Sequence, residues 1–143
     1  MKQLKVNITD GGRSKYFRGS AGDCVTRAVA LVTGRDYKEV YNEIRHLIGY
    51  TPRDGVKKKD TQKIMKHFGG SWNPCMGVGT GCRIHLSGEY SDEGYESIHE
   101  LPMHSSIVCN LSGHVCAVIN GVIHDTFDPS RGGTRCVYGF WAF

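Results

Sequence analysis

Apolar residues recur at helical spacing through the first half of the chain. One stripe, at i, i+3, i+4 and i+7, predicts a helix that begins at Asp23 or Cys24 and ends at Gly34. Similar stripes predict a second helix over 36–48 and a third over about 60–68. The first stripe consists of Val25, Ala28, Val29 and Val32.

The second half of the chain has the pattern of strands. Apolar runs of strand length occur at 106–111, 115–119, 122–127 and 137–143. Asn120-Gly121 joins the second run to the third, and this dipeptide is the strongest short signal for a β-hairpin.

Helices that precede strands along a chain are typical of an α+β fold. We expect N-terminal helices packed on a C-terminal antiparallel β-sheet, in a single domain that spans 1–143. Alternating apolar residues at 4–8 predict a further short strand near the N-terminus. The segment 71–84 shows little periodicity, and the polar, acidic segment 88–100 predicts an exposed loop.

Composition and charge narrow the class of protein. The chain has 39% hydrophobic and 22% charged residues and a formal charge of +4, whose only dense cluster is the lysine run 57–59, so nucleic-acid binding is not expected. No stretch is apolar enough to cross a membrane or to act as a signal peptide, which predicts a cytoplasmic protein. Without a secretion signal, we expect the six cysteines to be reduced thiols.

Cys24 stands where the first helix is predicted to begin, and a helix N-terminus favours a thiolate. The partial positive charge of the helix N-terminus lowers a thiol pKa by at most ~1.5 units from ~8.5, so activation of the thiol also needs a cationic neighbour. Among the seven histidines, His114 lies where a Ser-Gly pair gives way to an apolar strand, a position that a cleft can reach. The sequence therefore predicts that His114 is the base for Cys24.

The hairpin predicts the third partner. With Asn120 and Gly121 as the turn, side-chain alternation places Asp125 on the same face of the sheet as His114, diagonally opposite it. A carboxylate there would orient the imidazole and stabilise its protonated form. Asp128 falls on the other face and is the reserve candidate for this role.

The order of these parts resembles the papain-like cysteine peptidase superfamily. Its members place the nucleophile at a helix N-terminus, against an antiparallel sheet that carries His and then Asp or Asn. The segments 22–28 and 114–128 are also similar to small bacterial and bacteriophage proteins. The resemblance implies a cysteine hydrolase that transfers acyl groups without metal or cofactor. It also implies a protein or peptide substrate. If the gene is viral, the resemblance implies that this substrate is a host protein in the host cytoplasm.

One position departs from the family. Papain-like peptidases usually carry a glutamine about six residues before the nucleophile, where it helps to bind the oxyanion, and here that position is Arg18. The Cys24 backbone N–H with a side chain such as Arg18 or Ser20 would have to replace it. The main alternative is therefore a catalytically degenerate papain-like protein that binds or inhibits a partner.

Three other patterns have weaker chemical interpretations. Cys82 and His85 have two-residue ligand spacing with Cys75 nearby, a possible zinc site that lacks a fourth ligand. The glycines at 77–81 lack the residues of a nucleotide-binding loop and are better explained by turns. The aromatic residues within 138–143 form either a partner patch or, more commonly for a strand, part of the core.

Overall fold

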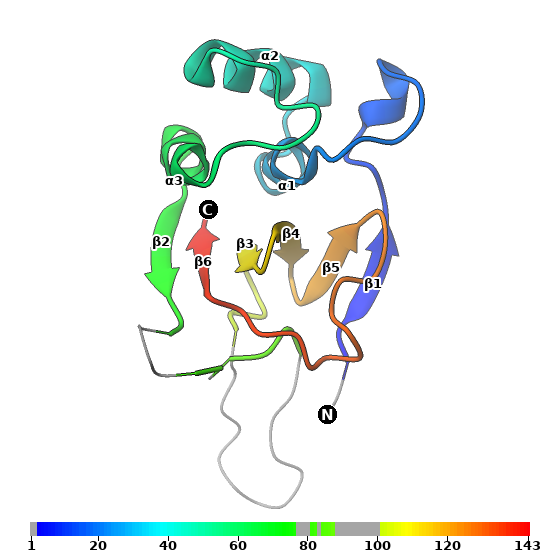
Figure 1. Ribbon diagram of the computed structural model, residues 1–143. Helices are drawn as coiled ribbons and strands as arrows, with labels where there is room; N and C mark the ends of the chain where they lie inside the picture. The colour runs from blue at the N-terminus through cyan, green and yellow to red at the C-terminus, as the bar shows by residue number, and fades with distance from the viewer. Residues whose placement is uncertain (1–2, 77–80, 83, 88–100) are drawn as a thin grey trace, which may run out of the picture.

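The computed structural model describes residues 3–76, 81–82, 84–87 and 101–143. Within these residues it contains three α-helices and a six-stranded sheet, so the predicted α+β class is confirmed. The helices gather on one face of the sheet (Figure 1). The α-helices are α1 (Cys24–Thr33), α2 (Tyr37–Ile48) and α3 (Lys58–His67), and a short 3-10 helix, η1 (Arg13–Lys15), precedes them.

The helix boundaries follow from local signals. Helix α1 begins at Cys24 after the N-cap Asp23 and ends at the C-cap Gly34, as predicted. Helix α2 begins after Asp36, whose carboxylate accepts a hydrogen bond from the Glu39 backbone N–H at 3.2 Å. Helix α3 begins two residues earlier than its apolar stripe suggested, because its first turn is polar.

The strands are β1 (Lys5–Ile8), β2 (Ser71–Pro74), β3 (Ser106–Leu111), β4 (His114–Ile119), β5 (Val122–Asp125) and β6 (Gly139–Ala142). Their order across the sheet is β1-β5-β4-β3-β6-β2. The C-terminal strands β3, β4, β5 and β6 pair antiparallel as predicted, but the sheet as a whole is mixed, because β1 pairs in parallel with β5. The chain must cross from β1 through all the helices before it returns to β5, which allows a parallel pair.

Strand β2 was not expected from the sequence. It pairs antiparallel with β6 and places Trp72 opposite Trp141, with ring centroids 4.7 Å apart. The Trp72 ring packs over Gly139, where only a glycine fits, because a Cβ at this position would lie 2.2 Å from the ring. The predicted loop at 88–100 and most of the glycine run at 77–81 lie outside the described residues.

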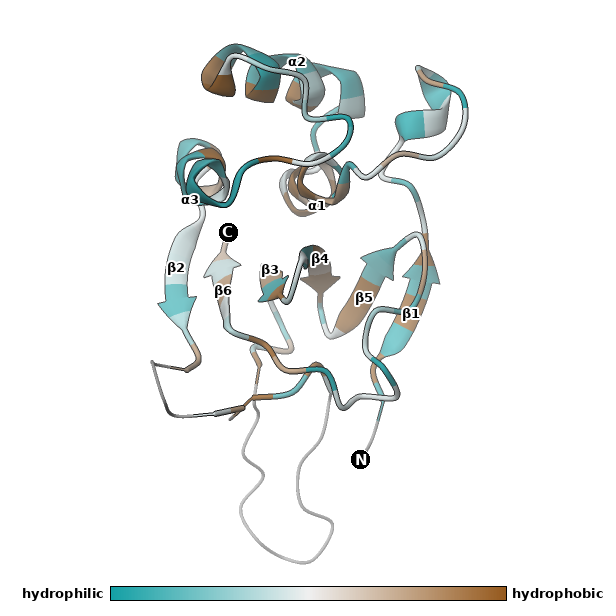
Figure 2. Ribbon diagram, in the orientation of Figure 1, coloured by the Kyte–Doolittle hydropathy of each residue, from teal (hydrophilic) through white to brown (hydrophobic). Residues whose placement is uncertain are grey.

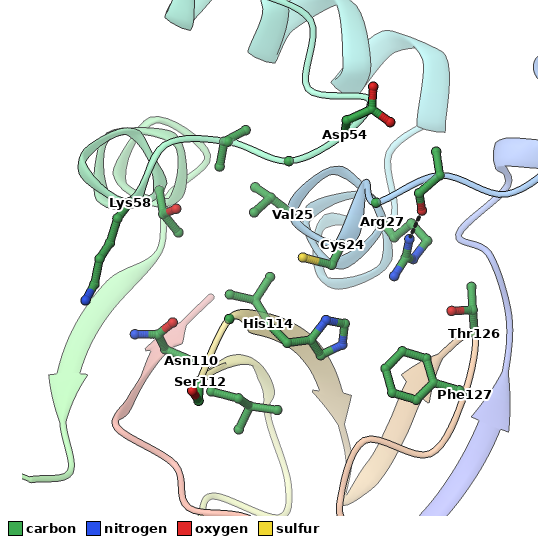
Figure 3. A pocket seen from close by; sticks show the side chains of 18 of the residues that line it. Cys24, Val25, Arg27, Asp54, Lys58, Asn110, Ser112, His114, Thr126 and Phe127 are labelled. Atoms are coloured by element: carbon green, nitrogen blue, oxygen red, sulfur yellow. Dashed lines mark hydrogen bonds between the residues drawn. The ribbon is translucent and has the colours of Figure 1, made fainter.

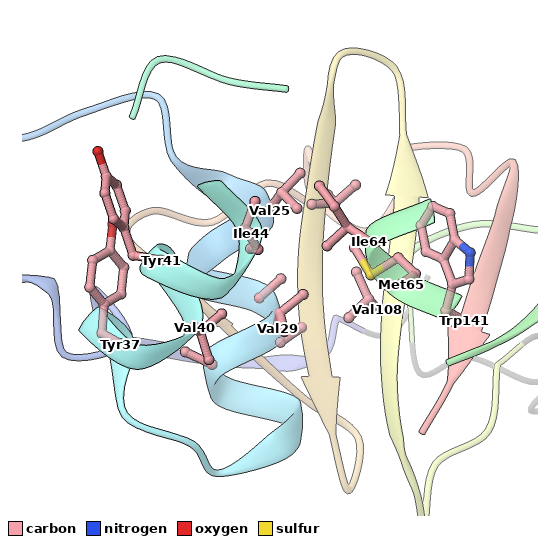
Figure 4. Close-up of a cluster of buried hydrophobic side chains, with 14 residues drawn as sticks. Val25, Val29, Tyr37, Val40, Tyr41, Ile44, Ile64, Met65, Val108 and Trp141 are labelled. Atoms are coloured by element: carbon pink, nitrogen blue, oxygen red, sulfur yellow. The ribbon is translucent and has the colours of Figure 1, made fainter. Parts of the chain in front are cut away.

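Two apolar clusters lie on opposite faces of the sheet. The first joins the helices to the sheet, with Val29, Ile44 and Trp141 among its fully buried members (Figure 4). The second covers the other face and includes Ile107 and Ile123. Helix α1 is the most apolar of the three helices in Figure 2 and lies between α2 and the sheet, a position that suits its composition.

The terminal aromatic residues divide between the two possibilities that the sequence left open. Trp141 is buried, and Phe140 and Phe143 pack against the clusters, so these three anchor the core. Tyr138 is 40% exposed. Among the described residues, no helix is long and apolar enough to span a membrane.

Candidate active site

Cys24 is the first residue of α1, and its side chain is half-buried at the edge of a cavity (Figure 3). Helix α1 is held against strand β4 because Val25 and Val29 pack in the same apolar cluster as Val115 and Ala117. The thiol therefore lies at the positive end of a helix whose orientation is fixed by packing.

His114 begins strand β4, directly after the turn that joins β3 to β4. Leu111 pairs with His114 across this turn, so Ser112 and Gly113 form a two-residue connection. The imidazole is 11% exposed and lines the same cavity as Cys24. The predicted position of His114, at the mouth of a strand and within reach of a cleft, is confirmed.

Asp125 meets His114 as the hairpin argument predicted. The distance from His114 Nε2 to Asp125 Oδ2 is 2.6 Å, and Asp125 is only 3% exposed. The hairpin has the expected register, with Ile119 opposite Val122, and Asn120 takes a positive φ of 50°. A short contact between these two side chains fixes the imidazole with its other ring nitrogen directed away from the carboxylate.

Asp128 does not share this contact. It is exposed, and its carboxylate accepts a hydrogen bond from the Ser130 backbone N–H at 2.9 Å, within the turn that follows β5. The Phe127 ring instead lies against the His114 imidazole, with centroids 5.2 Å apart, although β5 itself ends at Asp125. Phe127 thus covers one face of the histidine while remaining 48% exposed itself.

The environment changes the pKa of both candidate catalytic groups. Burial alone would raise the pKa of the Cys24 thiol, but the hydrogen bond with His114 and the charges of His114 and Arg27 more than offset it, and the pKa is lowered. Burial would lower the pKa of His114, yet the hydrogen bonds with Asp125 and Cys24 raise it to about 9. Both shifts favour a thiolate beside an imidazolium at neutral pH.

A buried polar network lies behind Asp125. The Arg27 guanidinium contacts Asp125 Oδ1 at 3.4 Å and also forms an ion pair with Asp23, which is 1% exposed. The Tyr37 hydroxyl donates a hydrogen bond to Asp23. Arg13 completes the network, 3.3 Å from the Tyr37 hydroxyl and 3.7 Å from Asp23.

This network explains why two charged residues are buried at the start of α1, Asp23 just before the helix and Arg27 in its first turn. The charge of Asp23, next to Cys24 in the sequence, would oppose a thiolate, but the structure pairs that charge with Arg27. Arg27 in turn holds Asp125 from the side opposite His114. Arg27 lies outside the apolar stripe of α1, so its burial could not be predicted from the sequence.

The cavity around Cys24 and His114 has a volume of about 890 Å³. Its wall is both apolar and polar, and Figure 3 shows residues from α1, from the segment before α3 and from the β3–β4 turn around it. Lining residues that the sequence did not single out for this site include Asp54, Lys58, Asn110, Phe127 and Tyr138.

The two predicted oxyanion side chains are not part of this wall. Arg18 and Ser20 are both exposed, and neither is among the described residues that line the cavity. The chain reaches Cys24 through Ala21 and Gly22, which line the cavity in their place, so the replacement of the missing glutamine by Arg18 or Ser20 stays a prediction that the cavity wall does not support. The Cys24 backbone N–H, in the first turn of α1, lacks an intrahelical acceptor and is the donor that remains.

The cysteines depart from expectation at one pair. Cys82 and Cys136 form a disulfide, so the prediction that all six thiols are reduced is wrong. Their sequence separation is 54 residues, and a loop of that length gives about 4 kcal/mol of stabilisation in the chain-entropy model. The other cysteines, all in the described part of the chain, are free thiols: Cys24, Cys75, Cys109 and Cys116.

Comparison with known proteins gives no family for the chain. No family model, curated protein or solved structure matches it significantly.

Proposed function

We propose that this protein is a small cysteine hydrolase of papain-like design, with Cys24 as nucleophile, His114 as base and Asp125 as the residue that orients the base. The observation that carries the proposal is the 2.6 Å contact between His114 and Asp125 beside the Cys24 thiol, inside a cavity. A nucleophile, its base and a third orienting group within hydrogen-bond reach are the signature of covalent catalysis.

The order and placement of the three residues support the papain-like assignment. The nucleophile begins the helix that packs on the sheet, and His and Asp follow in that order on neighbouring strands. The fold alone would not imply activity. The pKa shifts add to the argument, because they favour the thiolate form of Cys24 and the protonated form of His114.

In the proposed reaction, His114 takes the thiol proton and the Cys24 sulfur attacks a carbonyl carbon of the substrate. The negative charge on the carbonyl oxygen is stabilised by the Cys24 backbone N–H at the N-terminus of α1. His114 then gives its proton to the leaving amine, and the acyl group remains on Cys24 as a thioester. Water, activated by His114, releases the acid and restores the thiol.

The cavity suits a peptide or protein substrate. Phe127 and Tyr138 are 48% and 40% exposed, and both line the cavity, where they offer apolar surface to a side chain. Asp54 and Lys58 supply opposite charges elsewhere on the wall. Peptide cleavage, amide hydrolysis, deamidation and transfer to an amine all share the acylation of Cys24, so that step defines the proposed activity.

The proposal is tested with an activated ester that acylates cysteine nucleophiles. We expect a burst of leaving group, with one acyl group on Cys24 in the intact-protein mass spectrum. Cys24→Ala and His114→Ala should each abolish the burst, and the double variant should be no worse than either, because residues that act as a unit have non-additive effects. Cys75→Ala, which removes another half-buried thiol outside the cavity wall, is the matched control.

A catalytically degenerate binding protein is the second candidate. It is favoured by one observation, the absence of Arg18 and Ser20 from the described cavity wall, because loss of an oxyanion donor typically costs 10²–10³ in rate. If a well-folded Cys24→Ala protein retains its full effect in cells, the binding function stands and the hydrolase proposal fails.

A further inference from the structure

Three side chains that ligate metals meet outside the active-site cavity. Cys82 and His85 lie in the segment after β2, and Cys136 lies shortly before β6. Their ligand atoms all lie within 4.8 Å of one another. All three are described residues, and none of them is in the cavity wall around Cys24.

The backbone holds the two segments in register at this point. His85 and Cys136 form an antiparallel bridge. On one side of the bridge the Leu86 N–H donates to the Arg135 carbonyl at 2.8 Å, and on the other the Val137 N–H donates to the Ile84 carbonyl at 2.8 Å. The two segments lie side by side below the sheet in Figure 1, and the bridge with its two hydrogen bonds places His85 next to Cys136.

The donor set is the one that zinc prefers. Thiolates and imidazoles are the ligands of structural zinc sites, and Cys82 and His85 stand in Cys-x-x-His spacing. Bond lengths of about 2.3 Å to sulfur and 2.0–2.1 Å to nitrogen put the ligand atoms of a tetrahedral zinc about 3.5–3.8 Å apart. The three ligand atoms lie within 4.8 Å of one another, which is close enough for that spacing. Three protein ligands leave the fourth position of a tetrahedral zinc for water.

We propose that Cys82, His85 and Cys136 bind Zn²⁺ in the reduced protein, and that the Cys82–Cys136 disulfide is the oxidised state of the same site. A dithiol reductant passes two electrons and its two thiol protons to the Cys82–Cys136 disulfide; the protein S–S bond breaks, an S–S bond forms in the reductant, and two protein thiols remain. Zinc then binds as both thiols release their protons to solvent. The site cross-links the same two segments in both states, and it does not depend on the proposed hydrolase activity.

Cys75 is the residue that the sequence suggested as the partner of Cys82 and His85. The structure groups Cys136 with them instead, although Cys75 lies in the same part of the fold and its N–H donates to the Tyr138 carbonyl at 2.9 Å. Burial also raises the pKa of the Cys75 thiol, which disfavours the thiolate that a metal requires. Cys75 is therefore the matched control.

The test uses Co²⁺, which occupies zinc sites and gives sulfur-to-metal charge-transfer absorption. The full chain is reduced with a phosphine, desalted without oxygen and titrated with Co²⁺, and Zn²⁺ is then added to displace it. We expect one equivalent to bind with thiolate charge-transfer bands. Cys82→Ser and Cys136→Ser should abolish the bands, and His85→Ala should weaken binding by more than the roughly 10–100-fold cost of losing an outer-shell partner.

Cys75→Ser should bind Co²⁺ like the wild type, and the oxidised protein should bind none. A second measurement needs no variant: Zn²⁺ should protect Cys82 and Cys136, but not Cys75, from alkylation in the reduced wild-type protein. The proposal is overturned if the reduced protein binds no Co²⁺, if Cys136→Ser keeps the bands, if Cys75→Ser loses them, or if Zn²⁺ leaves alkylation of Cys82 and Cys136 unchanged.

Discussion

Asp125→Asn changes the charge beside His114 with little change in shape. The carboxylate is buried, lies 2.6 Å from His114 Nε2 and accepts a hydrogen bond from the Thr126 N–H at 2.7 Å. An asparagine can keep the Thr126 hydrogen bond but cannot stabilise an imidazolium by charge. We therefore expect the pKa of His114 to fall.

The size of that fall follows from the pKa of His114, which is raised from 6.5 to about 9. A shift of this size corresponds to about 3 kcal/mol at 1.36 kcal/mol per unit. Cys24 supplies part of it, and solvent in the cavity screens the pair, so we assign about 1–2 kcal/mol to Asp125, or roughly one pKa unit. His114 in the variant should therefore titrate near pH 8.

The assay is an NMR titration of protein labelled in its histidines, with the His114 signal identified by its absence in His114→Gln. Asp128→Asn is the control, since this exposed carboxylate caps a turn and makes no contact with the imidazole. The wild type and Asp128→Asn should titrate near pH 9. An Asp125→Asn protein whose His114 titrates like the wild type would refute the claim that this contact charges the base.

Three further outcomes are expected. Arg27→Met removes the nearer of the two arginines that pair with the buried Asp23, and also the arginine beside Asp125, so it should lower the free energy of unfolding in urea by about 3–5 kcal/mol; a loss below about 1 kcal/mol would show that the network adds little. Because the pKa of His114 is raised above 6.5, the stability from its ion pairs is complete below about pH 6.5 and is lost as the pH rises through about 9. The free energy of unfolding measured in urea should therefore fall over that range, and a His114→Gln protein with the same pH dependence would contradict this. Gly139→Ala places a methyl group 2.2 Å from the Trp72 ring and should cost about 1–3 kcal/mol with a change in tryptophan fluorescence, whereas wild-type stability and fluorescence would mean that the two rings do not pack this way.

Local chemistry made most of the helices and strands predictable. Helix α1 ends where its C-cap Gly34 stands in the sequence, since a glycine cap acts within the last turn of a helix. Strand β2 could not be predicted in the same way. Its Trp72 gains its stabilisation from Trp141, which is distant in the sequence, and from the small size of Gly139.

The contact between His114 and Asp125 was predictable because the Asn120-Gly121 turn fixes the register of the hairpin. The parallel pairing of β1 with β5 was not, since it joins segments separated by all three helices. The disulfide between Cys82 and Cys136 was equally hidden, because no spacing rule connects two cysteines so far apart.

The Asp23–Arg27 network was missed for a different reason. Charged residues at a helix start usually face solvent, and a single sequence does not reveal that Tyr37, on the next helix, brings its hydroxyl to the same carboxylate. The oxyanion candidates Arg18 and Ser20 are a related case. Separation along the chain placed Arg18 near Cys24, but the backbone between them turns its side chain toward solvent.

The central claim is that Cys24 is a nucleophile activated by its helix and by His114. Limiting iodoacetamide at neutral pH, followed by peptide mapping of the free thiols, measures this directly, because thiolate fraction governs the rate of alkylation. The account predicts that Cys24 is labelled first and that His114→Ala slows its labelling. Earlier labelling of Cys75, the other half-buried free thiol, or a Cys24 rate that does not depend on His114, would contradict it.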